Sequence, residues 1–235
     1  MNVEYYNIVN QLPLVNNWCI VTKLHKYYIN TDYKLIYDIS IAKLYIRYGF
    51  NHWDYGMVFA TLNNNFELVK FFIEKGANNW NSGMSFAVEK NNFNLVKFFI
   101  GKGADYWDGG MVIAALNNHI SLVKFFIEKG ADTWNGGMAN AARNNHFELV
   151  KFFIEKGVDD WNNYMSCAAQ NNHFDLVKFF IEKGADAWNF GMIHAAYNNH
   201  LDLVKFFIEK GADNYHNCYN YTSSQEIKDY LQQFL

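Results

Sequence analysis

Residues 134–160 read WNGGMANAARNNHFELVKFFIEKGVDD, and this stretch decides the fold. Its first half places Met138 and the alanine pair 141–142 at positions i, i+3 and i+4, which is the apolar stripe of a helix. The asparagine pair 144–145 then ends that helix, because asparagine often replaces glycine in the left-handed conformation that terminates helices. The first half of the stretch therefore predicts a short helix followed by a tight turn.

The second half, FELVKFFIEKG, predicts a longer amphipathic helix. Its apolar and charged residues separate onto two faces: Leu149, Val150, Phe153 and Ile154 on one, and Glu148, Lys151 and Glu155 towards solvent. Gly157 follows as a C-terminal cap, and Lys156 lies in the last turn, where the helix dipole favours a cation. A connecting loop completes the unit.

This pattern returns every 27 residues (80 − 53 = 27) from 53 to 214 without an insertion. Three residue types keep the period: Trp53, Trp80, Trp107, Trp134, Trp161 and Trp188; Met57, Met84, Met111, Met138, Met165 and Met192; Gly76, Gly103, Gly130, Gly157, Gly184 and Gly211. One such helix pair cannot bury its apolar face, whereas stacked neighbours can. We therefore expect an all-α solenoid of stacked helix-turn-helix repeats, with these residues in structural roles.

The two ends are expected to close the array. Residues 1–52 are predicted to form an N-terminal helical cap with one degenerate repeat, in which 41–49 matches a second helix. Residues 53–214 form six repeats, and 215–235 form a capping repeat with Tyr215 at the tryptophan position. A separate module at the N-terminus is the alternative to the cap.

The composition excludes several classes of function. The chain has 235 residues, of which 51% are hydrophobic and 19% aromatic, and its formal net charge is −3, so it has no basic surface for nucleic acid or an anionic membrane. Three distant cysteines suit a reducing compartment. No secretory signal or bilayer-length apolar run is present, so we expect an intracellular, cytoplasmic protein without a membrane partner.

The stretch AARNNHFELVKFFIEKG resembles the second half of an ankyrin repeat, with Asn145 and His146 in place of Gly-His. The resemblance covers about residues 26–235. Ankyrin units run to about 33 residues and open on a β-turn with Thr-Pro-Leu-His. Here Gly137-Met138 stands at the Pro-Leu position and about six residues are missing, so we expect the β-hairpin fingers to be reduced or absent.

The resemblance implies a protein–protein interaction module with no cofactor and no catalysis. The Asn-, Lys-, Ile-, Phe- and Tyr-rich composition is also similar to the ankyrin families of giant amoebal DNA viruses, which implies a viral protein in a host cytoplasm.

Two residue types that recur at a fixed position of the repeat, here called columns, can each be interpreted chemically or structurally. The six tryptophans either form a ladder on which single-stranded nucleic acid stacks, or fill the place of the missing fingers. We favour the structural role. The histidine column either binds metal or makes the hydrogen bond between repeats that the ankyrin resemblance implies, and we favour the hydrogen bond: His119, His146, His173 and His200.

Catalysis finds no support in the sequence. No nucleophile and base stand out as a pair, and no glycine-rich phosphate loop follows a strand. The glycine pairs at 109–110 and 136–137 are interpreted as tight-turn residues, and the lysines and glutamates of the second helices as a solvated face with charges at i, i+4.

The differences between repeats point to a binding surface. The third, seventh and tenth residues differ from repeat to repeat. The tenth varies from apolar to charged, which a core position could not tolerate, so the tenth at least must face solvent. We predict that they form the partner-binding surface: Tyr55, Phe59, Leu62, Phe86, Glu89, Ile113, Leu116, Asn140, Arg143, Gln170, His194 and Tyr197. The apolar members gather towards the N-terminal repeats as an anchor patch, although drift at unconstrained surface sites would give a similar pattern.

The leading hypothesis is a scaffold or adaptor that binds a protein partner through the first helices and short loops. One alternative is a self-associating structural protein of a virion or filament. The other is a single-stranded nucleic-acid binder that uses the tryptophan ladder.

Overall fold

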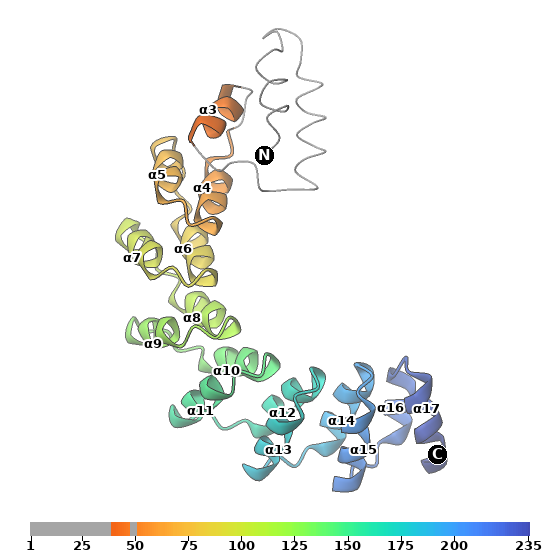
Figure 1. The fold of residues 1–235 in the computed structure, drawn as a ribbon. Coiled ribbons are helices and arrows are strands. Elements are labelled where there is room, and N and C mark those ends of the chain that lie inside the picture. The colour runs from red at the N-terminus through yellow and green to blue at the C-terminus, as the bar shows by residue number, and fades with distance from the viewer. Residues whose placement is uncertain (1–38, 48–50) are drawn as a thin grey trace, which may run out of the picture. The chain divides into compact units, whose positions relative to one another are not determined.

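The computed structural model describes residues 39–47 and 51–235, and every regular element in those two ranges is a helix (Figure 1). The expectation of an all-α fold without β-hairpin fingers is confirmed for this part of the chain. The chain divides into two compact units, Met1–Ala104 and Asp105–Leu235, and each is described by itself.

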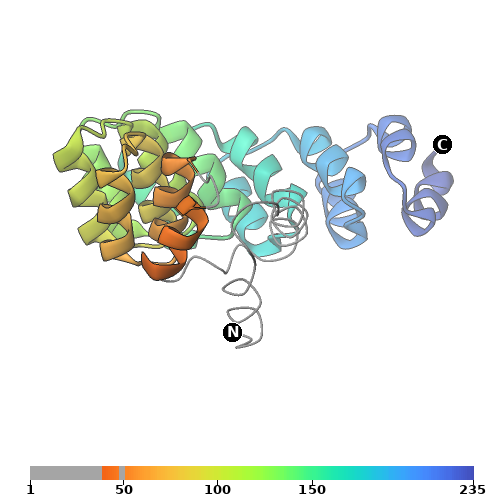
Figure 2. The same cartoon turned by 90° about the horizontal axis from the view of Figure 1, so that it is seen from above.

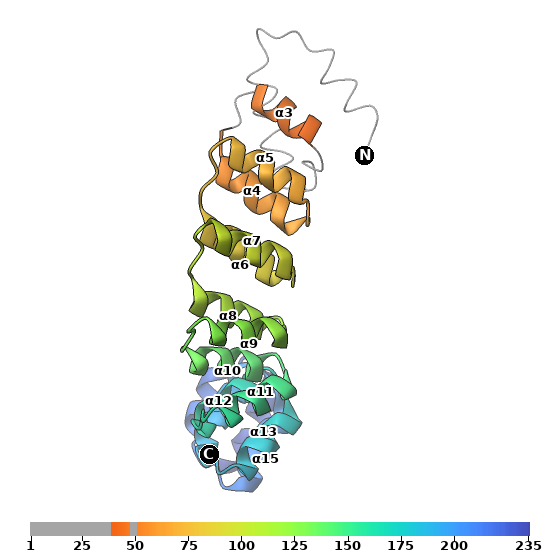
Figure 3. The same cartoon turned by 90° about the vertical axis from the view of Figure 1, so that its left-hand side faces the viewer.

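The described part of the first unit contains two complete repeats and one preceding helix. Its elements are α3 (Ile39–Arg47), α4 (Trp53–Leu62), α5 (Phe66–Glu74), α6 (Trp80–Glu89) and α7 (Phe93–Lys102). Helix α4 packs on α6, and the pairs α4–α5 and α6–α7 are seen in Figure 3. Helix α3 keeps the 27-residue register with α5 (66 − 39 = 27) and packs against it. The predicted cap in residues 1–38 lies outside the described residues.

The second unit contains four complete repeats and a terminal helix pair. Its elements are α8 (Trp107–Leu116), α9 (Ile120–Glu128), α10 (Trp134–Arg143), α11 (Phe147–Glu155), α12 (Trp161–Gln170), α13 (Phe174–Glu182), α14 (Trp188–Tyr197), α15 (Leu201–Lys210), α16 (Tyr215–Tyr221), α17 (Gln225–Leu231) and a 3-10 turn η1 (Gln232–Phe234). The first helices α8, α10, α12, α14 and α16 pack in succession. Figure 2 shows α14–α15 in light blue and α16–α17 in dark blue from above.

The core consists of the residues that the sequence pattern selects. In the fourth repeat Met138 and the alanine pair 141–142 of α10 are fully buried. Leu149, Val150 and Phe153 of α11 are fully buried as well. Ile154, which was expected on the same face, is only partly buried. The methionines of the other repeats are likewise fully buried: Met57, Met84, Met111, Met165 and Met192.

Both turns of each repeat are closed by a residue in the left-handed conformation. Asn145 has φ 57°, as expected, and the equivalent asparagine of every complete repeat also has a positive φ. Gly157, with φ 91°, donates its N–H to the Ile154 carbonyl at 2.9 Å, and Val158 donates to Phe153 at 3.2 Å. These two bonds are the Schellman pattern, which satisfies the last carbonyls of the second helix.

The interpretation of the glycine pairs as turn residues is wrong, because they lie in the first turns of α8 and α10. A Cβ on Gly137 would lie 2.5 Å from Phe153 Cζ, and one on Gly110 would lie 2.6 Å from Phe126 Cζ. The second glycine of each pair therefore makes room for a phenylalanine of the second helix. In the fifth repeat Tyr164 takes this position and is fully buried.

The lysines of the second helices pair differently from the expected i, i+4 pattern. Lys151 Nζ lies 3.0 Å from Glu148, three residues earlier, and 4.8 Å from the centre of the Phe147 ring. Lys70 makes the equivalent pair of contacts with Glu67 and Phe66. The aromatic residue that opens these helices is therefore covered by a lysine stem.

The C-terminal pair departs from the repeat register. Helix α17 begins at Gln225, three residues before the position equivalent to the start of α15 (201 + 27 = 228). Phe234, in the 3-10 turn after α17, stacks on Tyr215, with ring centres 4.9 Å apart and an interplanar angle of 20°. The division into a cap, six repeats and a capping repeat stays a prediction.

Candidate partner-binding surface

In the first, third, fifth and sixth repeats, the second residue joins that repeat to the loop before the next one. Asp54, Asp108, Asn162 and Asn189 each accept two backbone N–H groups with one side-chain oxygen, from residues 24 and 25 positions later. The asparagines also donate Nδ2 to the carboxylate of the following loop, from Asn162 to Asp186 at 3.1 Å. This inter-repeat clasp holds the short loops in the absence of a β-hairpin.

Asp108 makes the clasp with three hydrogen bonds, all accepted by one oxygen. Its Oδ1 accepts the N–H of Asp132 at 2.9 Å, the N–H of Thr133 at 3.1 Å and the Thr133 hydroxyl at 2.9 Å. The hydrogen bonds from Asp132 and Thr133 lower the pKa of this carboxyl below its ordinary value, because they stabilise the charged form. The loop before α10 is thereby fixed to the start of α8.

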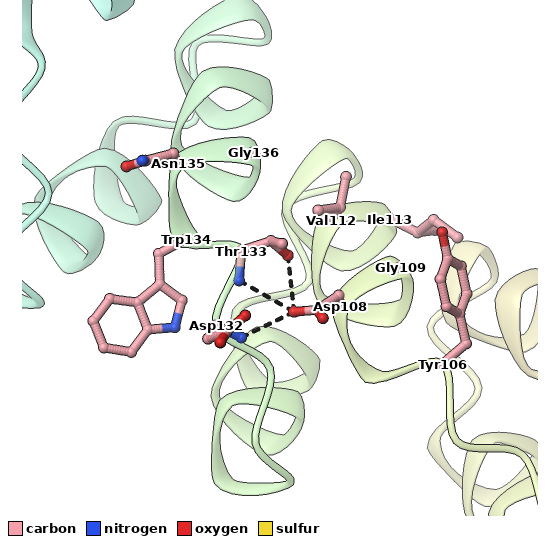
Figure 4. Close-up of a pocket in the computed structure, with 10 residues that line it drawn as sticks. All are labelled: Tyr106, Asp108, Gly109, Val112, Ile113, Asp132, Thr133, Trp134, Asn135 and Gly136. Atoms are coloured by element: carbon pink, nitrogen blue, oxygen red, sulfur yellow. Dashed lines mark hydrogen bonds between the residues drawn. The ribbon is translucent and has the colours of Figure 1, made fainter.

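A groove of ≈ 550 Å³ lies over this clasp at the starts of α8 and α10. Figure 4 shows Tyr106 and Trp134 on opposite sides of the Asp108 hydrogen bonds. Gly109 and Gly136 add no side chain to the lining, and Ile113, one of the predicted binding residues, belongs to it. The short loops therefore contribute a concave, partly acidic surface beside the first helices.

None of the twelve predicted binding residues is buried. In the first unit Tyr55 is 51% exposed, and Phe59, Leu62, Phe86 and Glu89 are partly exposed on α4 and α6. The other seven lie on α8, α10, α12 and α14 of the second unit, where Leu116, Arg143 and Tyr197 are exposed and the rest partly exposed: Ile113, Asn140, Gln170 and His194. The predicted anchor patch is thus divided between the two units.

Two exposed aromatic residues on this surface are absent from the predicted set, although one of them, Phe190, lies in a variable column. Tyr106, 54% exposed, precedes the tryptophan of the third repeat. Phe190, 48% exposed, occupies the third position of the sixth repeat. Variation at the position before the tryptophan (Thr133, Asp160 and Ala187 elsewhere) was the signal for Tyr106, and an aromatic residue in a variable column was the signal for Phe190.

The histidine column makes hydrogen bonds between repeats. The Nε2 atoms of three histidines lie within hydrogen-bond distance of a backbone carbonyl oxygen in the preceding repeat. In each case the carbonyl belongs to the residue that ends the first helix of that repeat. The distances are 3.0 Å for His146, 2.7 Å for His173 and 3.1 Å for His200. Donation to a carbonyl requires the proton on Nε2. Within residues 39–47 and 51–235, no three His, Cys, Asp or Glu side chains are grouped so that they could hold a metal ion.

The tryptophans are half-buried at the first position of each first helix. In the first, second and sixth repeats the indole ring lies close to the glycine that follows the second helix of the same repeat. A Cβ placed on Gly76, for example, would lie 3.6 Å from Trp53 Cδ1. Trp134 Nε1 donates to the Ala131 carbonyl at 3.0 Å. These contacts agree with a structural role more than with a ladder of free ring faces.

Comparison with known proteins identifies the repeat. The family model for ankyrin repeats (3 copies) matches residues 111–190 and again 165–224. Among solved structures, the ankyrin repeat domain of human ASB11 is similar with a TM-score of 0.53 and 16% sequence identity, over 76% of this chain and 97% of that one. The search of curated proteins found no match. Residues 111–224 are therefore similar to ankyrin repeats, and the chain has the fold of an ankyrin repeat domain.

Proposed function

We propose that the chain is a non-catalytic scaffold that binds a protein partner through the first-helix faces of its two units. These are the exposed sides of α4 and α6 in the first unit, and of α8, α10, α12 and α14 in the second, each with the loop before it. Ankyrin repeats generally mediate protein–protein interaction, which supports this proposal.

The position of the exposed apolar side chains is the observation that carries the proposal. In the described ranges, five large exposed hydrophobic residues belong to a first helix of a complete repeat or directly precede one: Tyr55, Tyr106, Leu116, Phe190 and Tyr197. On the second helices of those repeats, Phe66 alone is similarly exposed. Exposed apolar and aromatic side chains that lie on the first-helix side within each unit are typical of an interaction surface.

The test is affinity capture from the native cell with the full chain, in which wild type is compared with Leu116→Ser/Tyr197→Ser. Lys124→Gln, on the second helix α9, is the matched control. We expect a set of proteins that binds wild type and the control but not the double variant, with unchanged helical circular dichroism. Equal capture by all three chains would contradict the assignment of the surface.

Sedimentation at several concentrations separates this function from self-assembly. A scaffold for another protein stays at one mass, whereas a structural protein of a virion or filament grows with concentration. Concentration-dependent growth would replace the proposal by the self-association alternative.

The proposed location is the cytoplasm, or the host cytoplasm under the viral hypothesis that rests on composition alone. Cys167 and Cys218 are free and buried, which supports a reducing compartment. No helix in residues 39–47 and 51–235 has the length and apolar character to cross a lipid bilayer.

A further inference from the structure

The first helices of the fourth to sixth repeats form a face with a single cationic side chain. Helices α10, α12 and α14 contain no aspartate or glutamate, and Arg143 is their only lysine or arginine. Arg143 is exposed at the end of α10, and none of the ion pairs found in the described ranges includes it. Its charge is therefore available to a partner.

The charge of Arg143 extends across the neighbouring helices. The pKa of His194 on α14 is lowered chiefly by burial, and the charge of Arg143 lowers it further. This charge also acts on Cys167 of α12, where burial outweighs it and raises the pKa.

An apolar surface lies on α14, two helices away. Phe190 and His194 meet edge to face with ring centres 4.6 Å apart, and Tyr197 continues the same side of the helix. Phe190 is 48% and Tyr197 63% exposed. Between this surface and Arg143 stands Gln170, which is partly exposed at the end of α12, the helix that packs on both α10 and α14.

We propose that this face binds an extended acidic peptide segment of the partner, with an aspartate or glutamate on Arg143 and a large apolar side chain on Phe190 and Tyr197. The inference rests on the proposed scaffold function and names the chemistry of its partner.

The spacing of the helices fixes the length of the segment. Neighbouring packed helices lie about 8–10 Å apart, so the axes of α10 and α14, with α12 between them, are separated by roughly 16–20 Å. An extended chain advances about 3.3 Å per residue, so five or six residues join the carboxylate to the apolar side chain. The Gln170 amide lies where it can bond the peptide backbone between them.

A peptide fits this face better than a nucleic acid. Affinity for nucleic acid comes from several phosphate contacts made by lysine and arginine. One guanidinium on three helices supplies only one such contact, whereas the exposed rings of α14 provide the apolar anchor that a peptide side chain uses.

The first experiment is selection of random peptides of about ten residues displayed on phage against the full chain. We expect enrichment of Asp or Glu five or six positions from an aromatic or large aliphatic residue. Selection against Arg143→Glu should replace the acidic residue by Lys or Arg. Selection without an acidic preference, or unchanged by Arg143→Glu, would overturn the inference.

The second experiment measures the affinity of one selected peptide and of its version with the acid replaced by the amide. Because a hydrogen bond to a charged group contributes about 1.5–3 kcal/mol, Arg143→Gln should weaken the acidic peptide about tenfold or more and leave the amide peptide unchanged. Tyr197→Ser should weaken both peptides. Lys151→Gln, whose lysine pairs with Glu148 on a second helix, is the control and should alter neither.

Other occupants give distinct results. Tight binding of oligo(dT) that Arg143→Gln abolishes would assign the face to nucleic acid, and a dimer that Arg143→Gln dissociates would assign it to a second copy; either overturns the inference. If Leu116→Ser/Tyr197→Ser loses captured proteins while selected peptides show no acidic preference, the scaffold function stands and only the peptide chemistry fails.

Discussion

At the scale of single residues, Asp108 and Asn162 perform the same task with different chemistry. Both accept two backbone N–H groups of the next loop, but Asn162 also donates to Asp186. Asp108→Asn should therefore keep the clasp and leave the free energy of unfolding within about 0.5 kcal/mol of wild type. Asp108→Ala should lower it by about 1–2 kcal/mol, as loss of a helix cap does. Urea unfolding followed by circular dichroism measures both.

The pH dependence of these variants is a further check. Because the pKa of Asp108 is lowered in the folded chain, its stabilising contribution is present above the ordinary value of 3.8 and is lost as the pH falls through the folded pKa. Asp108→Asn should lose less stability than wild type in that acidic range. Equal stability of Asp108→Ala and wild type at neutral pH would refute the clasp.

Gly137 gives the second prediction at this scale. A Cβ there would lie 2.5 Å from Phe153 Cζ, so Gly137→Ala should destabilise the chain by about 1–3 kcal/mol through overpacking. Gly136, its neighbour, is the control, since a Cβ there meets only Val112 Cγ2 at 3.4 Å. Gly136→Ala should be neutral or stabilise α10 by about 0.5 kcal/mol, because alanine loses less backbone entropy. Similar effects of the two substitutions on the thermal midpoint would contradict the packing argument.

At the scale of the helix pair, the turn depends on one asparagine. Asn145 has φ 57°, and a left-handed residue with a Cβ costs roughly 1–2 kcal/mol. Asn145→Ala should therefore destabilise the chain by about 1 kcal/mol, while Asn145→Gly should match or exceed wild type. Asn144, with φ −109°, is the control, and Asn144→Ala should change stability by less than about 0.5 kcal/mol. A stable Asn145→Ala variant would show that the turn is held by its neighbours instead.

The helix pair was predictable because its signals are local. Met138 and the alanine pair after it define a helical stripe within five residues, and Asn145 and Gly157 mark the turns by residue type alone. The role of Gly137 was missed because the ring that needs its space lies 16 residues later (153 − 137 = 16), and glycine also suits a turn. The clasp was missed for a similar reason, since it joins side chains to a backbone 24 and 25 residues away.

The binding surface could be predicted only in outline. Variation among aligned repeats favours positions outside the core without ensuring that each residue there is exposed, and all twelve predicted residues are at least partly exposed. Which of them project most depends on packing: Tyr197 is 63% exposed, whereas Cys167, in the same variable columns, is buried. Charge pairing is equally invisible in the pattern, so the unpaired state of Arg143 emerged only from the structure.

At the scale of the whole molecule, His194 links stability to pH. Burial and the charge of Arg143 lower its pKa below the ordinary 6.5, so the unfolded chain binds this proton at a higher pH than the folded one. The free energy of unfolding should therefore fall as the pH decreases from above 6.5 towards the folded pKa. His194→Gln removes this titration, and its urea midpoint should fall less between about pH 7.5 and 5.5. Arg143→Gln should also reduce the fall, though by less, because burial is the larger cause of the shift. If wild type and His194→Gln lose the same stability over this interval, the acid sensitivity arises elsewhere in the chain.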